Sequence, residues 1–126
     1  MEEVKPVLTW TLFSECEIPE DLDKILVRGE KAIAAYRTFR DSAIFTNRRL
    51  IVRDVQGVTG KKVEIFSLPY SSIIMWSSEN AGHVDINSEI EIWTLIGRIK
   101  VCLKRGVNIR RFDKIISTAV LANTKE

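Results

Sequence analysis

Few side chains in this sequence have the type and spacing that catalysis or metal binding requires. Glu89 and Glu91 lie two residues apart, as two carboxylates that share acid–base work could. Charged and apolar residues alternate around them, so both fall on the polar face of a predicted strand, and we interpret them as charges that face water. His83 is the only histidine and has no cysteine close to it, so the sequence predicts no metal site.

Two further patterns fall short of a cofactor site. The Gly57 to Gly60 loop has the glycines of a phosphate-binding loop, but it lacks the Lys-Ser/Thr ending and the following helix. Cys16 and Cys102 are far apart and form neither a thiol-pair motif nor a zinc cluster. The sequence therefore predicts no catalytic residue, no cofactor and no metal, and this use of cysteine indicates a reducing compartment.

The length and charge of the chain limit its class. With 126 residues it is predicted to be a single domain, 1–126, large enough to form its own core. Its 19 Lys and Arg against 17 Asp and Glu leave a net charge of +2, evenly spread, which argues against a nucleic-acid partner. The N-terminus does not resemble a secretion signal, and no run approaches the roughly 20 apolar residues of a membrane span. We expect a cytoplasmic protein.

Residues 1–28 are predicted to form an N-terminal helical extension. Ile18-Pro19-Glu20-Asp21 resembles a helix start, because proline and acids are favoured in the first turn. Leu22, Ile25 and Leu26 then follow at helical spacing before Gly29. Residues 7–13 are ambiguous, since two threonines alternate with the apolar side chains, and we favour a helix there.

The rest of the chain predicts a mainly β fold. Seven segments carry β-branched and aromatic residues or alternate with period two: Ala32–Arg40, Ser42–Thr46, Arg49–Asp54, Lys61–Leu68, Ile73–Glu79, Ser88–Leu95 and Arg98–Lys104. Residues 108–121 repeat apolar side chains at steps of three and four, which predicts an amphipathic helix. This order favours a curved antiparallel sheet or partly open barrel, closed at one end by the C-terminal helix.

Several segments resemble the bacterial pleckstrin-homology-like (PH-like) domain family. They are RDSAIFTNRRLIVRD at 40–54, QGVTGKK at 56–62, SLPYSSI at 67–73 and SSENAG at 77–82. The resemblance covers a PH-like core at residues 30–121 and is much weaker over the extension. It implies seven antiparallel strands in two near-orthogonal sheets capped by a C-terminal helix. It also implies ring-like homo-oligomers and no enzymatic activity.

The sequence departs from the eukaryotic PH domains that bind phosphoinositides. Those domains usually place several Lys and Arg in a long loop between their first two strands, where the cations converge on clustered phosphates. Here the corresponding turn, residues 39–42, is tight and contributes only Arg40. We therefore do not expect a phosphoinositide pocket.

Two basic pairs are candidates for contact with an anion. Arg48, Arg49, Lys61 and Lys62 are predicted to lie at neighbouring strand ends, where they could bind an anionic ligand, an acidic partner or, weakly, a membrane surface. The alternative is a solvated, charged turn that keeps the strand edges soluble.

The strands also carry more apolar side chains than one buried face requires. Residues 61–68 and 73–78 are apolar on both faces, whereas a half-buried antiparallel strand should be polar on one. We name Ile51, Phe66, Trp76 and Trp93 as candidate residues of an interface between copies of this chain. The alternative is cover by the N-terminal and C-terminal segments of the same chain. The resulting prediction is a scaffold that self-assembles and contacts another protein.

Overall fold

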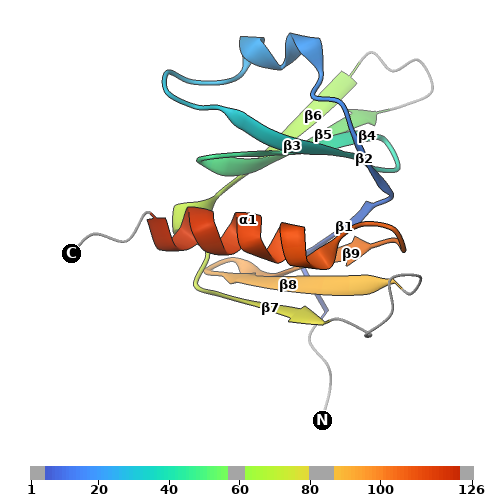
Figure 1. Cartoon of the computed structure of the whole chain (residues 1–126), viewed down its shortest axis with the longest axis vertical. Helices are drawn as coiled ribbons and strands as arrows, with labels where there is room; N and C mark the ends of the chain where they lie inside the picture. The colour runs from blue at the N-terminus through green and yellow to red at the C-terminus, as the bar shows by residue number, and fades with distance from the viewer. Residues whose placement is uncertain (1–4, 57–61, 80–86, 123–126) are drawn as a thin grey trace.

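The computed structural model describes residues 5–56, 62–79 and 87–122, and these form two sheets with a helix at their open side (Figure 1). The first sheet, sheet A, has the order β1-β9-β8-β7. Its strands are β1 (Leu8–Leu12), β7 (Met75–Glu79), β8 (Ser88–Thr94) and β9 (Gly97–Leu103). Neighbours in sheet A are antiparallel except β1 and β9, which run parallel.

The second sheet, sheet B, is an antiparallel meander in sequence order. Its strands are β2 (Ser14–Cys16), β3 (Ala32–Arg37), β4 (Asp41–Thr46), β5 (Arg49–Gln56) and β6 (Lys62–Pro69). Two short 3-10 helices, η1 (Glu20–Lys24) and η2 (Tyr70–Ser72), connect strands, and one α-helix, α1 (Ile109–Ala122), ends the described chain. The mainly β prediction, its two sheets and its C-terminal helix are confirmed. The seven predicted strands correspond to β3–β9 with shifted ends, but β1 and β2 are two further strands, and the pairing is not antiparallel throughout because β1 runs parallel to β9.

The predicted N-terminal helical extension is wrong. Within residues 5–28 the structure has β1, β2 and the five-residue η1, and no α-helix. In β1, Leu8, Trp10 and Leu12 pair in register with inward-facing residues of β9, while the threonines between them face outward. The period-two alternation was the correct signal, and β1 is an integral strand of sheet A.

The main core lies between the two sheets and beneath α1. Alternate residues of every long strand contribute to it, among them Phe45, Val52, Ile92 and Val101. The ring of Phe112 on α1 lies edge-on to Phe45, with 4.6 Å between the ring centroids. The side chain of Asn108 caps the helix by accepting hydrogen bonds from the N–H groups of residues 110 and 111, at 3.0 and 3.2 Å.

A second, smaller core covers the outer face of sheet B. Leu22 of η1 packs on Ala35, Ile44 and Ile51, all of them buried. The apolar stripe predicted on the N-terminal segment therefore does cover sheet B, although a 3-10 turn carries it. Ile51 is 0% exposed, so the structure places this candidate interface residue in the core of its own chain.

Gly97, in the β8–β9 turn, is a position that only glycine fits. Its φ is +135°, and a Cβ atom there would lie 2.7 Å from Cγ1 of Val7. We expect Gly97→Ala to destabilise the fold by about 2 kcal/mol or more, from backbone strain and the clash with Val7, the residue before β1. Thermal unfolding would measure this, with Gly106→Ala as the control.

Gly106 shares the strain but not the clash, since its φ is +97° and nothing lies within 4 Å of the added Cβ. Gly97→Ala should therefore cost more than Gly106→Ala, and combining it with Val7→Ala should recover part of the difference. If both alanine variants lose the same free energy of unfolding, the Val7 side chain moves away from the added Cβ without cost.

Candidate functional site

The turn between β4 and β5 is held by a buried ion pair. Arg49 Nε lies 2.8 Å from Glu30 Oε2, and Arg49 Nη2 lies 3.0 Å from Oε1, so the guanidinium binds both oxygens of the carboxylate. Arg49 Nη2 also donates to the carbonyl of Ile25 at 2.7 Å, and Nη1 donates to the hydroxyl of Ser67 at 2.9 Å. This pair joins the segment after η1 to sheet B.

The side chain of Glu30 is completely buried and fully bonded. Burial acts to raise its pKa, but hydrogen bonds from Arg49, from the Val27 N–H and from the Thr46 hydroxyl outweigh that effect and hold the pKa at about 2. Thr46 Oγ1 donates to Glu30 at 2.7 Å, and the Tyr70 hydroxyl donates to the Thr46 carbonyl at 2.8 Å. Since Glu30 is such a weak base, its contact with the Thr46 hydroxyl positions the turn and does not activate a nucleophile.

The predicted basic group does not come together. Arg49 aligns with Pro69, and Lys62 aligns with Gln56 at the other end of the same strand pair. That separation is roughly 23 Å at about 3.3 Å per residue. Arg49 is occupied by Glu30, and Lys61 lies outside the described residues. For Arg49 and Lys62 the prediction of neighbouring strand ends is wrong, because in the antiparallel pair β5–β6 Lys62 lies opposite Gln56, at the far end of β5 from Arg49.

Two of the candidate interface aromatics are partly covered within the chain. Phe66 faces the core beside Val52, and its ring centroid lies 6.0 Å from that of Trp10 on β1. Trp76 also faces the core, and its Nε1 donates to Asp113 Oδ1 of α1 at 3.1 Å. The N-terminal and C-terminal segments thus provide the cover that the sequence left open as an alternative. Trp93 lies on the outer face of sheet A, half-buried beside Met75.

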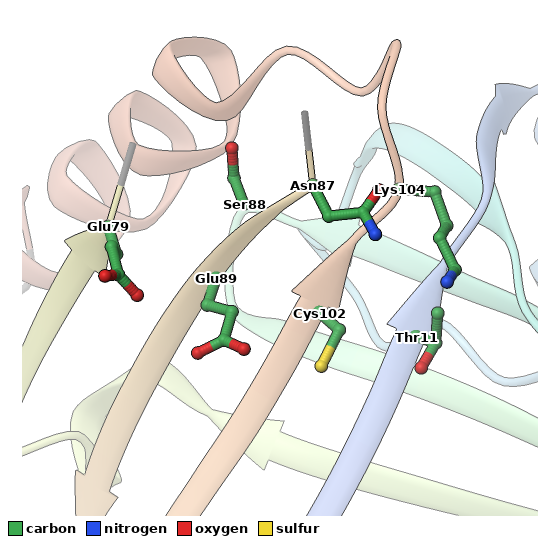
Figure 2. A pocket seen from close by; sticks show the side chains of 7 residues that line it. All are labelled: Thr11, Glu79, Asn87, Ser88, Glu89, Cys102 and Lys104. Carbon is green, nitrogen blue, oxygen red and sulfur yellow. The ribbon is translucent and has the colours of Figure 1, made fainter. Parts of the chain in front are cut away.

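The outer face of sheet A carries a polar groove of about 380 Å³. Figure 2 shows Glu79, Glu89, Cys102 and Thr11 on four adjacent strands, pointing the same way, with Lys104 at the end of β9. Glu89 and Glu79 are direct register partners, and Lys100 Nζ lies 3.2 Å from Glu89 Oε2. Glu91 pairs with Arg98 on the same face. The interpretation of Glu89 and Glu91 as solvent-side charges agrees with this geometry.

The groove offers no activated nucleophile. Burial raises the pKa of the Cys102 thiol, and nearby Glu89 adds to the increase, so the sulfur is mostly protonated at neutral pH. Within the described ranges, no three His, Cys, Asp or Glu side chains gather to hold a metal ion. Through its described lining residues the groove can accept hydrogen bonds and hold a polar group.

The sequence pattern of the bacterial PH domain family matches residues 5–120, which is nearly the whole chain. The chain belongs to this family. The match includes β1 and β2, so the PH domain begins well before the core at residues 30–121 that the quoted motifs cover.

Solved structures share this PH fold. A protein with a pleckstrin-homology domain from Shewanella loihica PV-4 has a TM-score of 0.76 and 36% identity, and the match covers 85% of this chain and 96% of that one. A PH domain from Shewanella amazonensis SB2B has a TM-score of 0.64 and 37% identity, with 79% and 82% covered. A PH-domain protein from Exiguobacterium sibiricum 255-15 is 20% identical with a TM-score of 0.55, over 90% of this chain and 61% of that one, and supports the fold alone.

Two relatives from Bacillus subtilis (strain 168) are uncharacterized. YjqA is 49% identical over 80 residues, 64% of each chain, and YozO is 34% identical over 73 residues, 58% of this chain and 63% of its own. The matches thus span less than two thirds of either relative. Across the described part of this PH domain, no helix is long and apolar enough to cross a membrane.

The PH domain also has exposed apolar residues that the sequence did not single out. Leu95 and Ile96, in the β8–β9 turn, are 93% and 75% exposed. Their signal is an aliphatic pair directly before a turn glycine, where polar residues are normal. The sequence does not reveal the exposure of this pair, because the pair follows a strongly alternating strand and resembles its continuation.

Proposed function

We propose that this PH domain is a non-enzymatic interaction module that assembles with copies of itself into a closed homo-oligomer and presents the assembly to another protein. The free edge of β6 is the observation that carries this proposal. β6 is eight residues long and, within the described residues, pairs only with β5.

The exposed face of β6 is apolar where an isolated edge strand should be polar. Val63 and Ile65 pair with outward-facing residues of β5 and remain 48% and 43% exposed. Natural edge strands are usually short, charged or covered, because an open apolar edge invites pairing with another chain. A second copy that docks along β6 would bury both side chains and use the free backbone groups.

Such a contact can close into a ring. When β6 of one copy meets a different surface of the next, the contact is heterologous, and it generates a cyclic oligomer if the rotation closes. The ring assembly implied by the family resemblance agrees with this. The two cysteines are free thiols, which supports a reducing, cytoplasmic location.

The anion-binding alternative loses its predicted site, because the cations around Arg49 and Lys62 are at opposite ends of β5 and β6. A non-enzymatic role is supported by the groove on sheet A, whose thiol is protonated, and by Glu30, whose low pKa makes it a poor base.

Self-association is tested by the solution mass of the chain. Size exclusion with light scattering should show an oligomer for the wild type, and Ile65→Lys should shift the mass toward the monomer, because a charge would replace the apolar contact at the edge. Ile18→Lys is the matched control: Ile18 is also 43% exposed but lies in the loop before η1. A monomeric wild type at high concentration would refute the proposal.

A further inference from the structure

The β8–β9 turn holds two aliphatic side chains in water at a fixed position. Thr94 pairs with Gly97, so Leu95 and Ile96 form a two-residue turn, where Asn, Asp and Gly are usual. The positive φ of Gly97 lets both residues keep negative φ. Thr94 Oγ1 accepts from the Ile96 N–H at 3.2 Å and donates to the Gly97 carbonyl at 3.0 Å, so its side chain bridges the turn.

An apolar groove extends from this tip to η2. It has a volume of about 400 Å³, and its lining includes Leu68, Pro69 and Ile74 together with the two turn residues. Ile74 is itself 62% exposed. The tip and the groove therefore form one continuous aliphatic surface outside the core.

Cations surround the other side of η2. The Tyr70 N–H of η2 donates to the Arg48 carbonyl at 3.2 Å, and the hollow beside Arg48 shares Pro69 and Ser71 with the apolar groove. The adjacent segment carries Arg28 and Lys31, and the Asn47 side chain bonds its backbone. All three cationic side chains are exposed, and over residues 5–56, 62–79 and 87–122 none of them forms an ion pair.

These segments lie on one side of the molecule. Figure 1 shows the loop between η1 and β3, the β4–β5 turn, η2 and the β8–β9 turn along its left side, with the C-terminal end of α1. We call the exposed cations and aliphatic residues of these segments the loop-end surface: Arg28, Lys31, Arg48, Ile74, Leu95 and Ile96. Glu30, within this region, is buried and paired with Arg49, so it does not offset the positive charge.

We propose that the loop-end surface docks this domain on an anionic lipid bilayer, with Leu95 and Ile96 inserted at the level of the headgroups and the cations against lipid phosphates. Aliphatic residues flanked by Lys and Arg are the combination that binds such an interface, since apolar burial and electrostatic attraction add together. A second copy does not fit, because a two-fold contact would bring the same three cations against each other. The inference does not depend on self-association through β6.

Vesicle co-sedimentation tests the docking. The wild type should sediment with equimolar phosphatidylcholine and phosphatidylglycerol, not with phosphatidylcholine alone, and its binding should fade as salt is raised. Leu95→Ser with Ile96→Ser should weaken binding about tenfold or more, because two inserted side chains are lost. Arg48→Gln should weaken binding about fivefold and reduce its salt dependence.

The control is Phe39→Ser, which removes a 76% exposed aromatic from the β3–β4 turn, on the other side of the molecule. It should bind vesicles like the wild type, and thermal unfolding would confirm that each variant folds. Absence of sedimentation at low salt, or full binding by the Leu95/Ile96 variant, would overturn the proposal. Competition by soluble glycerol phosphate would overturn it in favour of a headgroup pocket. A lower solution mass for that variant would instead assign the tip to contact between copies.

Discussion

Arg49→Met is expected to destabilise this PH domain by about 3–5 kcal/mol at neutral pH. The substitution removes the cation that binds both oxygens of Glu30 and leaves a carboxylate whose side chain is completely buried. Methionine keeps much of the volume of the arginine stem, so the loss comes mainly from the uncompensated charge. Equilibrium unfolding in urea, followed by tryptophan fluorescence, would measure it.

The free energy of unfolding that Arg49→Met loses should become smaller as the pH falls. In the wild type the pKa of Glu30 is about 2, below the ordinary 4.5, so its contribution is present above about pH 4.5 and is lost as the pH falls toward 2. Without Arg49, burial raises the pKa of Glu30 instead, and protonation relieves the strain of the variant. The gap between the variant and the wild type should therefore narrow in acid, and adding Glu30→Gln should recover part of the loss at neutral pH.

Arg53→Met is the matched control on the same strand. Arg53 pairs with Asp21 and Asp41, whose side chains are 59% and 28% exposed, so water can replace the lost partner. Its substitution should cost about 1 kcal/mol. If both arginine variants lose the same small amount, Glu30 is better hydrated than the structure indicates.

Phe112→Ala is expected to cost about 3–5 kcal/mol. Phe112 is fully buried where α1 meets both sheets, and its ring contacts those of Phe45 and Tyr36, with centroids at 4.6 and 6.1 Å. Truncation would remove the aromatic contacts and leave a cavity that the rigid strands on either side cannot close. Urea unfolding would give the loss, and near-ultraviolet circular dichroism would report the changed aromatic packing.

Leu121→Ala on the same helix is the control. Its side chain is 62% exposed, so its truncation should cost about 0.5 kcal/mol or less. A similarly small loss at Phe112 would mean that α1 is only loosely attached to the barrel.

Local patterns in the sequence predicted most of the fold. The alternation in β8 and β9 and the three-four spacing in α1 are short-range signals, and the structure follows them. The helix favoured for residues 7–13 is wrong, because residues 8–12 form β1, as the threonines at every second position indicate. Tertiary pairing with β9 decides that ambiguity, and no local pattern reports it.

The candidate sites were less predictable because they depend on which segments meet. Arg49 reads as a surface cation beside Arg48, and its partner Glu30 is identified only once the chain folds back. The sequence made Ile51 a candidate interface residue, but in the structure Leu22 of η1 covers it. Conversely, the exposure of Leu95 and Ile96 follows from a tight turn that ends at Gly97, which a strand pattern alone does not reveal.

The parallel pairing of β1 with β9 has a consequence for synthesis on the ribosome. Leu8 emerges early, yet its register partner is Ile99, near the other end of the domain. The edge of sheet A cannot be completed until almost the entire domain has left the exit tunnel, because no earlier strand pairs with β1 within the described residues. Closure of this long-range contact is therefore a late folding step, and a nascent chain stalled before β9 would keep β1 exposed as a target for chaperones.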